Sequence, residues 1–180
     1  TPPPLSTLAK PDIEGARLVI ESVLAERRKV LTEMESKTLL SAFHIPVTRT
    51  ILARSANEAM MIATQLGFPA VLKIDSPDIS HKSDVGGVAL NIMNATGVRD
   101  TYNDMMQTVK RLRPDARING VTVQSMVRSR HGREICIGLV TDDPFGPVIA
   151  FGAGGTMIEL INDRAMELPP LNQFLARRLI

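Results

Sequence analysis

The chain has little aromatic surface and almost no thiol chemistry. Its 180 residues include one cysteine, one tyrosine and no tryptophan, and aromatic residues make up 3% of the total. A single cysteine, Cys136, excludes an internal disulfide, and this predicts a reducing compartment, which we take to be the cytoplasm. So few aromatic rings leave little surface for base stacking, and we expect no nucleic-acid partner.

Long hydrophobic runs and a strong charge of one sign are also absent. No apolar stretch approaches the roughly 20 residues that a membrane-spanning helix needs, and the N-terminus lacks a signal-peptide pattern, so no membrane partner is expected. The formal net charge of +2 comes from mixed signs spread along the chain. With 44% hydrophobic and 22% charged residues, the composition is typical of a globular protein with a proper core.

The N-terminal residues 1–12 hold four prolines and predict an extended linker. Asp12 is a candidate cap for a connecting helix within residues 13–31. Thr32 and Glu35 form a capping-box pattern at the start of the next helix. The proline-rich opening and a final helical pattern that stops at Ile180 predict a piece of a longer chain.

The hydrophobic periodicity predicts alternating helices and strands. We expect helices at about 32–43, 56–66 and 98–112, the last one capped by Thr96, and the start of another at 172–180. We expect strands at about 47–52, 70–74, 88–92, 121–127, 134–140, 148–151 and 157–161. This order predicts an α/β fold of two small lobes, at 32–114 and 115–180, with a ligand cleft between them.

The stretch from Pro69 to Ile92 carries the strongest chemical signal. Lys73 lies inside an apolar strand, where an ammonium group is costly unless it meets a charge. A polar loop follows, and it ends in Gly86-Gly87, whose backbone N–H groups could approach an anion closely. These features fit a phosphate clamp, and they also fit an ordinary polar hairpin loop with Lys73 facing solvent.

Three other places carry weaker signals. Glu159 and Asp163 follow a glycine cluster and could hold Mg²⁺ against phosphates, or form a solvated acidic turn. The strand end from Gln124 to Val127 could present backbone groups to an adenine edge, or simply lead into a solvated loop. Glu134 could bind a hydroxyl or a metal, or face water at a strand end.

Four motifs resemble one protein family. They are E-S-K-x-L-L from Glu35, I-P-V from Ile45, V-L-K-I-D-S-P-D-I-S-H-K-S-D-V-G-G-V from Val71 and F-G-P-V-I-A-F-G-A-G-G-T-M-I-E-L-I-N-D-R-A from Phe145. The chain from about residue 32 onward resembles the ATP-grasp domain of the NDP-forming acyl-CoA synthetases. It looks closest to the version in the large bacterial protein lysine acetyltransferases, where a synthetase-like region is fused to an acetyltransferase domain.

This resemblance implies an ATP-grasp fold, truncated at its C-terminus, with a site for ATP or ADP and Mg²⁺ between two lobes. Lys73 would meet the phosphates, and Lys82, Gly86 and Gly87 would form a loop that covers them. His81 would be a phosphohistidine that relays a phosphoryl group, and we therefore expect it to lie exposed on this loop. The adenine hinge would comprise Gln124, Ser125, Met126 and Val127, and the groups near metal or ribose would be Glu159, Glu134 and Asp163.

Departures from the family pattern limit what the chain can do alone. His44 stands where the family usually has glycine, and the later E-x-D-x-N-P metal-binding stretch is absent. Our first hypothesis is a nucleotide-binding part of a lysine acetyltransferase, whose missing acetyltransferase and CoA-binding domains would handle acetyl-CoA and protein substrates. The alternatives are the ATP-grasp part of a synthetase that converts acyl-CoA, ADP and phosphate into acid, CoA and ATP, or a non-catalytic regulatory or oligomerisation module.

Overall fold

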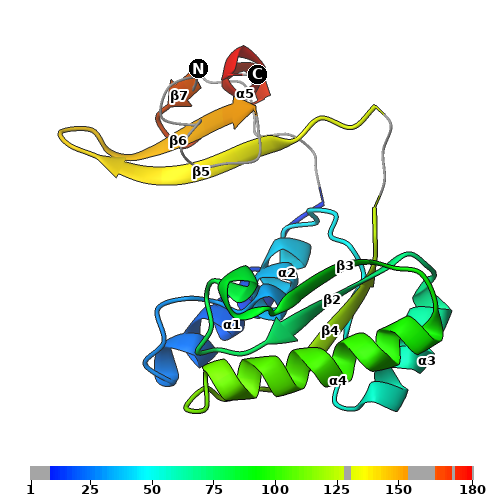
Figure 1. Ribbon diagram of the computed structural model, residues 1–180. Helices are drawn as coiled ribbons and strands as arrows, with labels where there is room; N and C mark the ends of the chain where they lie inside the picture. Colours follow the sequence, from blue (N-terminus) through cyan, green and yellow to red (C-terminus); the bar gives the residue numbers. More distant parts are fainter. Residues whose placement is uncertain (1–8, 128–130, 154–164, 172, 180) are drawn as a thin grey trace. The chain divides into compact units, whose positions relative to one another are not determined.

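The computed structural model describes residues 9–127, 131–153, 165–171 and 173–179, and these form two compact units (Figure 1). The N-terminal unit is Ala9–Val127, and the C-terminal unit contains the described residues that follow it. The predicted α/β architecture is confirmed. The predicted boundary near Pro114 is not where the structure divides, because the strand after it belongs to the sheet of the first unit.

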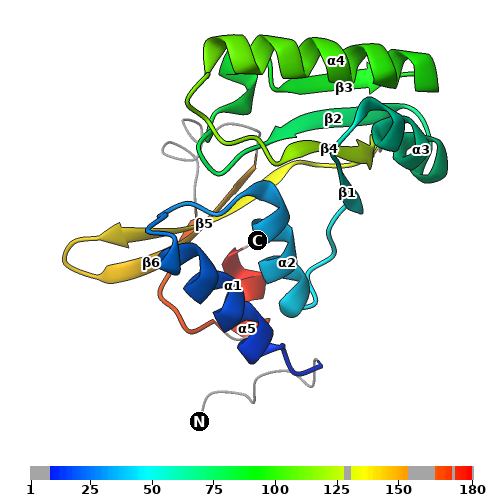
Figure 2. The same ribbon diagram turned by 90° about the horizontal axis from the view of Figure 1, so that it is seen from below.

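The N-terminal unit contains a four-stranded antiparallel sheet and four α-helices (Figures 1 and 2). In chain order the elements are α1 (Ile13–Ala25), α2 (Glu33–Ala42), β1 (Thr50–Ala53), α3 (Ala56–Leu66), β2 (Ala70–Asp75), the 3-10 helix η1 (Lys82–Val85), β3 (Val88–Ile92), α4 (Ala95–Leu112) and β4 (Gly120–Ser125). The sheet order is β1-β4-β2-β3. Helices α3 and α4 pack on each other and against the sheet.

Local side-chain caps determine where these helices begin. Thr32 and Glu35 form the expected capping box at the start of α2, and Ser55 caps α3 by accepting from the Glu58 backbone N–H. Asp12 caps α1, as predicted, but this helix ends at Ala25 because Arg27 adopts a positive φ of 58°. The helix predicted at about 98–112 is confirmed as α4, but its predicted cap was wrong, because the cap is Asn94, two residues before Thr96.

Strands β2 and β4 present two different faces. On one face, their side chains form a buried core with side chains of α3 and α4. The strand residues in this core are Ala70, Leu72, Ile74, Val121 and Val123. Alternation then places Lys73, Asp75, Thr122 and Gln124 on the opposite face. The candidate site is built on this second face, against the start of α2.

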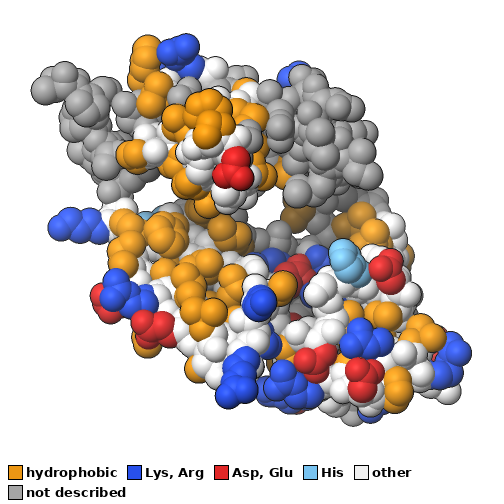
Figure 3. All heavy atoms as spheres, turned by 90° about the vertical axis from the view of Figure 1, so that its left-hand side faces the viewer, with side chains coloured by type: hydrophobic (Ala, Val, Ile, Leu, Met, Phe, Trp, Pro, Cys, Tyr) orange, Lys and Arg blue, Asp and Glu red, His pale blue; other side chains and the backbone are white. Residues whose placement is uncertain are grey.

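The described residues of the C-terminal unit form a three-stranded antiparallel sheet followed by a short helix. Its elements are β5 (Ile135–Asp142), β6 (Gly146–Ala153), β7 (Ala165–Glu167) and α5 (Gln173–Leu179), and the strand order is β5-β6-β7. On β5, Ile135, Ile137 and Leu139 are all exposed, and hydrophobic side chains gather on this unit in Figure 3. The strand expected at 157–161 lies outside the described residues.

Candidate functional site

A polar cavity of about 520 Å³ lies between the start of α2 and the loop that follows β2. The residues that line it include Glu33, Lys73, His81 and Lys82, whose side chains are ionisable. Lys73, His81 and Lys82 belong to the stretch that the sequence singled out. The structure therefore brings Lys73, Lys82 and His81 into one hollow, whereas Gly86 and Gly87 do not line it.

Two lysines of the cavity converge on one carboxylate. The Lys73 Nζ donates to Glu33 Oε1 at 2.7 Å, and the Lys82 Nζ donates to Glu33 Oε2 at 3.0 Å. A third ammonium, that of Lys37, lies 3.5 Å from Glu33 Oε1. Lys73 thus meets the charge that its place in an apolar strand requires, and the interpretation as a solvent-facing hairpin lysine is wrong.

The ion pairs keep Glu33 ionised. Burial by itself raises the pKa of this carboxyl, but the hydrogen bonds from Lys73 and Lys82 outweigh it and lower the pKa to about 2. Burial also lowers the pKa of Lys37, against the opposing effect of Glu33. The cluster therefore groups three lysine side chains around one ionised carboxylate, that of Glu33.

The capping box explains why Glu33 reaches the lysines. Thr32 is the N-cap of α2, which makes Glu33 the first residue of that helix. An acidic side chain is favoured there by the positive end of the helix dipole. Thr122 of β4 stabilises β2 at Lys73, because its buried hydroxyl donates to the Lys73 carbonyl oxygen at 3.2 Å.

The loop between β2 and β3 is anchored at several points. Ile79 is buried in the core, and the Asp78 carboxylate accepts from the Arg117 backbone N–H at 2.7 Å, a hydrogen bond that lowers the pKa of Asp78. The Arg117 guanidinium donates to the same carboxylate, so Asp78 is paired with Arg117. The loop then forms η1 and returns to β3.

Gly86 and Gly87 close the loop rather than offering free donors. Gly86 has a φ of 68°, and its N–H donates to Ser83. The Gly87 N–H donates to the Lys82 carbonyl at 2.7 Å, and a side chain here would place a Cβ 2.5 Å from Ile74 Cγ2. Both N–H groups are thus used within the turn, contrary to the expectation that they would face an anion.

His81 lies on the surface of this loop. It precedes η1, it is exposed, and its ring forms no hydrogen bond with the described residues. The expectation of an exposed histidine on the loop is confirmed. An exposed imidazole that lines a cavity is accessible to an incoming phosphoryl group.

The predicted adenine hinge begins beside the lysine cluster. The Gln124 side-chain oxygen accepts from Lys37 Nζ at 3.0 Å and from the Thr50 hydroxyl at 3.2 Å. Ser125 pairs with Ala70 across the sheet, and the Met126 N–H donates to the Pro69 carbonyl. The exposed side chain of Val127 ends the N-terminal unit. An adenine-binding role for this strand end stays a prediction.

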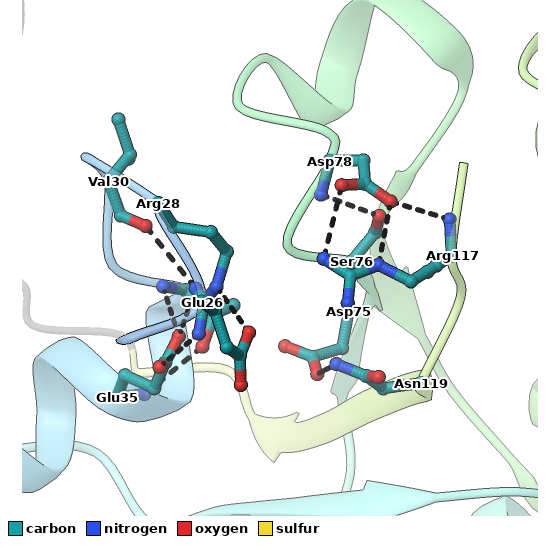
Figure 4. Close-up of polar contacts among 10 residues, drawn as sticks. Glu26, Arg28, Val30, Glu35, Asp75, Ser76, Asp78, Arg117 and Asn119 are labelled. Atoms are coloured by element: carbon teal, nitrogen blue, oxygen red, sulfur yellow. Dashed lines mark hydrogen bonds and ion pairs between the residues drawn. The ribbon is translucent and has the colours of Figure 1, made fainter. Parts of the chain in front are cut away.

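A second polar hollow lies on the same face of the sheet (Figure 4). The Arg28 guanidinium donates to both oxygens of Glu35, at 2.9 and 2.8 Å, and this lowers the pKa of Glu35 to about 2. The Asp75 Oδ2 accepts from the Asn119 side chain, whereas the buried Asp75 Oδ1 has no hydrogen-bond partner among the residues that the structure describes. The Arg28–Glu35 pair stabilises the start of α2, and the hydrogen bond between Asn119 and Asp75 stabilises the end of β2.

The remaining predicted residues follow the N-terminal unit in the chain. Glu134 is exposed just before β5 in the C-terminal unit, whereas Glu159 and Asp163 lie outside the described residues. Among the residues with described positions, no group of three or more His, Cys, Asp or Glu side chains could hold a metal ion. In the same part of the chain, every helix is too short or too polar to cross a bilayer.

Sequence reasoning missed Glu33 and Lys37. They are four residues apart at the start of a capped helix, with the acidic residue first, which is the favourable order for a pair on a helix. That spacing could have indicated a helical ion pair. It could not have indicated that β2 would bring a further lysine to the same carboxylate.

Comparisons with known proteins point to one family. A model of an ATP-grasp domain family matches residues 22–180. The beta subunit of an ADP-forming acetate–CoA ligase I from Pyrococcus furiosus is 38% identical over 161 residues, which are 89% of this chain and 68% of that subunit.

Two solved structures of one archaeal enzyme are also similar. They show the dinucleotide-forming acetyl-coenzyme A synthetase 1 of Ca. Korarchaeum cryptofilum. One, with coenzyme A and Ca-AMPCP, has a TM-score of 0.82 and 40% identity over 91% of this chain and 71% of that chain. The other, with coenzyme A and Mg-AMPPCP and its phosphohistidine segment pointing towards the nucleotide binding site, has a TM-score of 0.72 and 35% identity over 91% and 68%.

These relatives are acyl-CoA-forming ligases, and none of them is an acetyltransferase. They therefore support the synthetase alternative better than our first hypothesis of a lysine acetyltransferase. The chain belongs to the ATP-grasp domain family and corresponds to the ATP-grasp portion of the ADP-forming acetyl-CoA ligases, as found in their beta subunits.

Proposed function

We propose that this chain is the nucleotide-binding part of an ADP-forming acyl-CoA synthetase and that its polar cavity seats the phosphates of ATP or ADP. The observation that carries the proposal is the convergence of Lys73 and Lys82 on one carboxylate inside that cavity. Two ammonium groups that each bind one oxygen of a carboxylate can also bind two oxygens of a phosphate. The nucleotide complex of the archaeal synthetase supports the same assignment.

We infer that His81 exchanges a phosphoryl group in this seat, because this exposed residue lines the same cavity as the two lysines. In the direction of ATP formation, ADP attacks the phosphorus of phosphorylated His81, the N–P bond breaks, and the imidazole is left neutral as ATP forms. In the opposite direction the neutral ring takes the terminal phosphoryl group and ADP leaves. Lys73 and Lys82 neutralise the phosphate charge in both directions.

We also propose how the other ligands of the parent enzyme bind. Mg²⁺ would supply additional neutralisation of phosphate charge, and its proposed ligands are Glu159 and Asp163. Adenine would lie along Gln124 to Val127, and Glu134 would approach the ribose or the metal. A CoA-binding partner subunit would bring the acyl group as its CoA thioester, by analogy with the beta-subunit relative and the coenzyme A complexes.

Calorimetric titration with ATP and with ADP, each with Mg²⁺, tests the phosphate seat. In Lys73→Ala and in Lys82→Ala, binding should weaken by about 1.5–3 kcal/mol, because each variant loses a charged hydrogen bond to phosphate. Lys110→Ala, in the last turn of α4, is the matched control for loss of one positive charge. Unchanged affinity in a folded Lys73→Ala protein would reject the seat.

A further inference from the structure

Glu33 stands between the two lysines that the proposed function assigns to phosphate. Both of its carboxylate oxygens are used, one by each ammonium group, at 2.7 and 3.0 Å. We propose that Glu33 is an internal anion of the phosphate seat: its carboxylate holds the place of a phosphate between Lys73 and Lys82, and it leaves that place when a phosphate binds. The inference rests on the proposed function and names how that same site is regulated.

The first argument is chemical equivalence. Carboxylates and phosphates are alternative acceptors for the same cations, and both form short charge-assisted hydrogen bonds with lysine. The Glu33, Lys73 and Lys82 side chains are all mostly buried, so the lysines have little solvent with which to replace a lost partner. An internal carboxylate therefore keeps the seat electrically satisfied in the absence of ligand.

The second argument is electrostatic exclusion. A phosphate gripped by both ammonium groups would bring its own negative charge against the Glu33 carboxylate. Protonation cannot remove that repulsion at neutral pH, because the Lys73 and Lys82 hydrogen bonds overcome the effect of burial and hold the pKa of Glu33 near 2. The carboxylate must therefore move for the two lysines to close on a phosphate.

The ammonium group of Lys37 is a partner to which the displaced Glu33 carboxylate can move. Its Nζ lies 3.5 Å from Glu33 Oε1, one helical turn along α2, and it donates to Thr50 at 2.6 Å and to Gln124 at 3.0 Å. Burial lowers the pKa of Lys37, so a closer carboxylate would stabilise its charged form. Glu33 can thus exchange one ammonium partner for another without entering water alone.

The consequence is a lower affinity than the lysines alone would give. Phosphate binding must break two ion pairs of Glu33 before it forms its own, so part of the binding free energy is used for the exchange. Departure of the phosphate is correspondingly easier, because Glu33 returns to the lysines. This suits an enzyme that releases and rebinds nucleotide in every cycle.

The test measures pyrophosphate binding by calorimetry without metal, in the unmodified protein and in Glu33→Gln. The variant removes the competing charge while both lysines stay, so pyrophosphate should bind about tenfold more tightly. A residue that merely positioned the lysines would give the opposite sign. Glu35→Gln is the matched control, because it neutralises a carboxylate on the same helix, and glutamine can preserve the capping box with Thr32.

A second variant tests the exchange itself. Lys37→Gln should weaken pyrophosphate binding more in the protein that retains Glu33 than in the Glu33→Gln background. Only the protein that retains Glu33 has a displaced carboxylate that needs a new partner. Circular dichroism and thermal melts establish that each variant is folded. If Glu33→Gln does not fold, Glu33→Asp, whose shorter side chain cannot span both lysines, should tighten binding in the same direction.

The possible outcomes separate the two proposals. Unchanged or weaker pyrophosphate binding in folded Glu33→Gln, with clear binding by the unmodified protein, would overturn the role of Glu33 alone. An equal gain in Glu35→Gln would overturn it too, because the effect would then be general charge removal. Absence of binding in both the unmodified protein and Glu33→Gln would overturn this role together with the phosphate seat.

Discussion

Acidification should destabilise the N-terminal unit through Glu33. The pKa of this carboxyl falls from its ordinary value of 4.5 to about 2 in the folded protein, because the hydrogen bonds from Lys73 and Lys82 exceed the opposing effect of burial. Protons then bind the unfolded chain more tightly than the folded one. The stabilisation is therefore fully present above the unfolded pKa and is lost as the pH falls from about 4.5 towards 2.

The size of the effect follows from the same values. A pKa lowered from 4.5 to about 2 corresponds to about 3 kcal/mol of stability with Glu33 fully ionised. About one-fifth of the side chain is exposed, and solvent screening reduces the expected contribution to roughly 2 kcal/mol. By pH 3 about half of it should be lost.

Urea unfolding, measured at several pH values between 3 and 7, can detect this loss. Tyr102 is the one tyrosine of a chain without tryptophan and is buried in the core of the N-terminal unit, so its fluorescence reports on that unit. The unmodified protein should exceed Glu33→Gln in stability by about 2 kcal/mol at pH 7 and by about 1 kcal/mol at pH 3.

A control variant separates this effect from general charge removal. Asp100→Asn removes an exposed carboxylate that pairs with its neighbour Arg99, and it should change stability little at any of these pH values. If the difference between the unmodified protein and Glu33→Gln is the same at pH 3 as at pH 7, the ion pairs do not hold the carboxyl at a low pKa. The reasoning about the phosphate seat would then lose its electrostatic basis.

Two further predictions concern the loop between β2 and β3. Incubation with ATP, Mg²⁺ and a CoA-binding partner subunit should give phosphohistidine at His81 by mass spectrometry, and His81→Ala should abolish ADP-forming synthesis; retained synthesis by the variant would remove His81 from the relay. Gly87→Ala should lower stability by about 1–3 kcal/mol in urea unfolding, because its Cβ would lie 2.5 Å from Ile74 Cγ2 and 2.8 Å from the Lys82 carbonyl oxygen. Gly67→Ala has open space at its Cβ and a positive φ, so it is a control for backbone strain without a clash.

The features that depend on neighbouring residues could be predicted from the sequence. Asp12 and Thr32 cap their helices as expected, because a cap needs only a side chain and the backbone N–H groups of the next turn. The alternation of β2 also gave the correct argument for Lys73, since a lysine in a buried strand must find a charge. Long motifs gave the ATP-grasp family, which the comparisons confirm.

Prediction was less reliable where two neighbouring residues could both cap a helix, and where the pairing of a strand depended on distant parts of the chain. Asn94 rather than Thr96 caps α4, although both residue types can accept the same hydrogen bond. β4 follows a proline break, which suggested a new lobe, yet it pairs with both β1 and β2. Strand pairing is decided by the packing of the whole sheet and cannot be read from one segment.

The sequence by itself determined the capped helices, the strand that carries Lys73 and the exposed loop that carries His81. Only the tertiary structure decided which charge Lys73 meets. Its partner Glu33 lies 40 residues earlier in the chain, and Lys82 reaches the same carboxylate across 49 residues. Such a contact depends on where α2 docks on the sheet, and docking is set by the burial of side chains from several elements at once. Local rules fix each element, whereas the electrostatics of the site arise only when the elements meet.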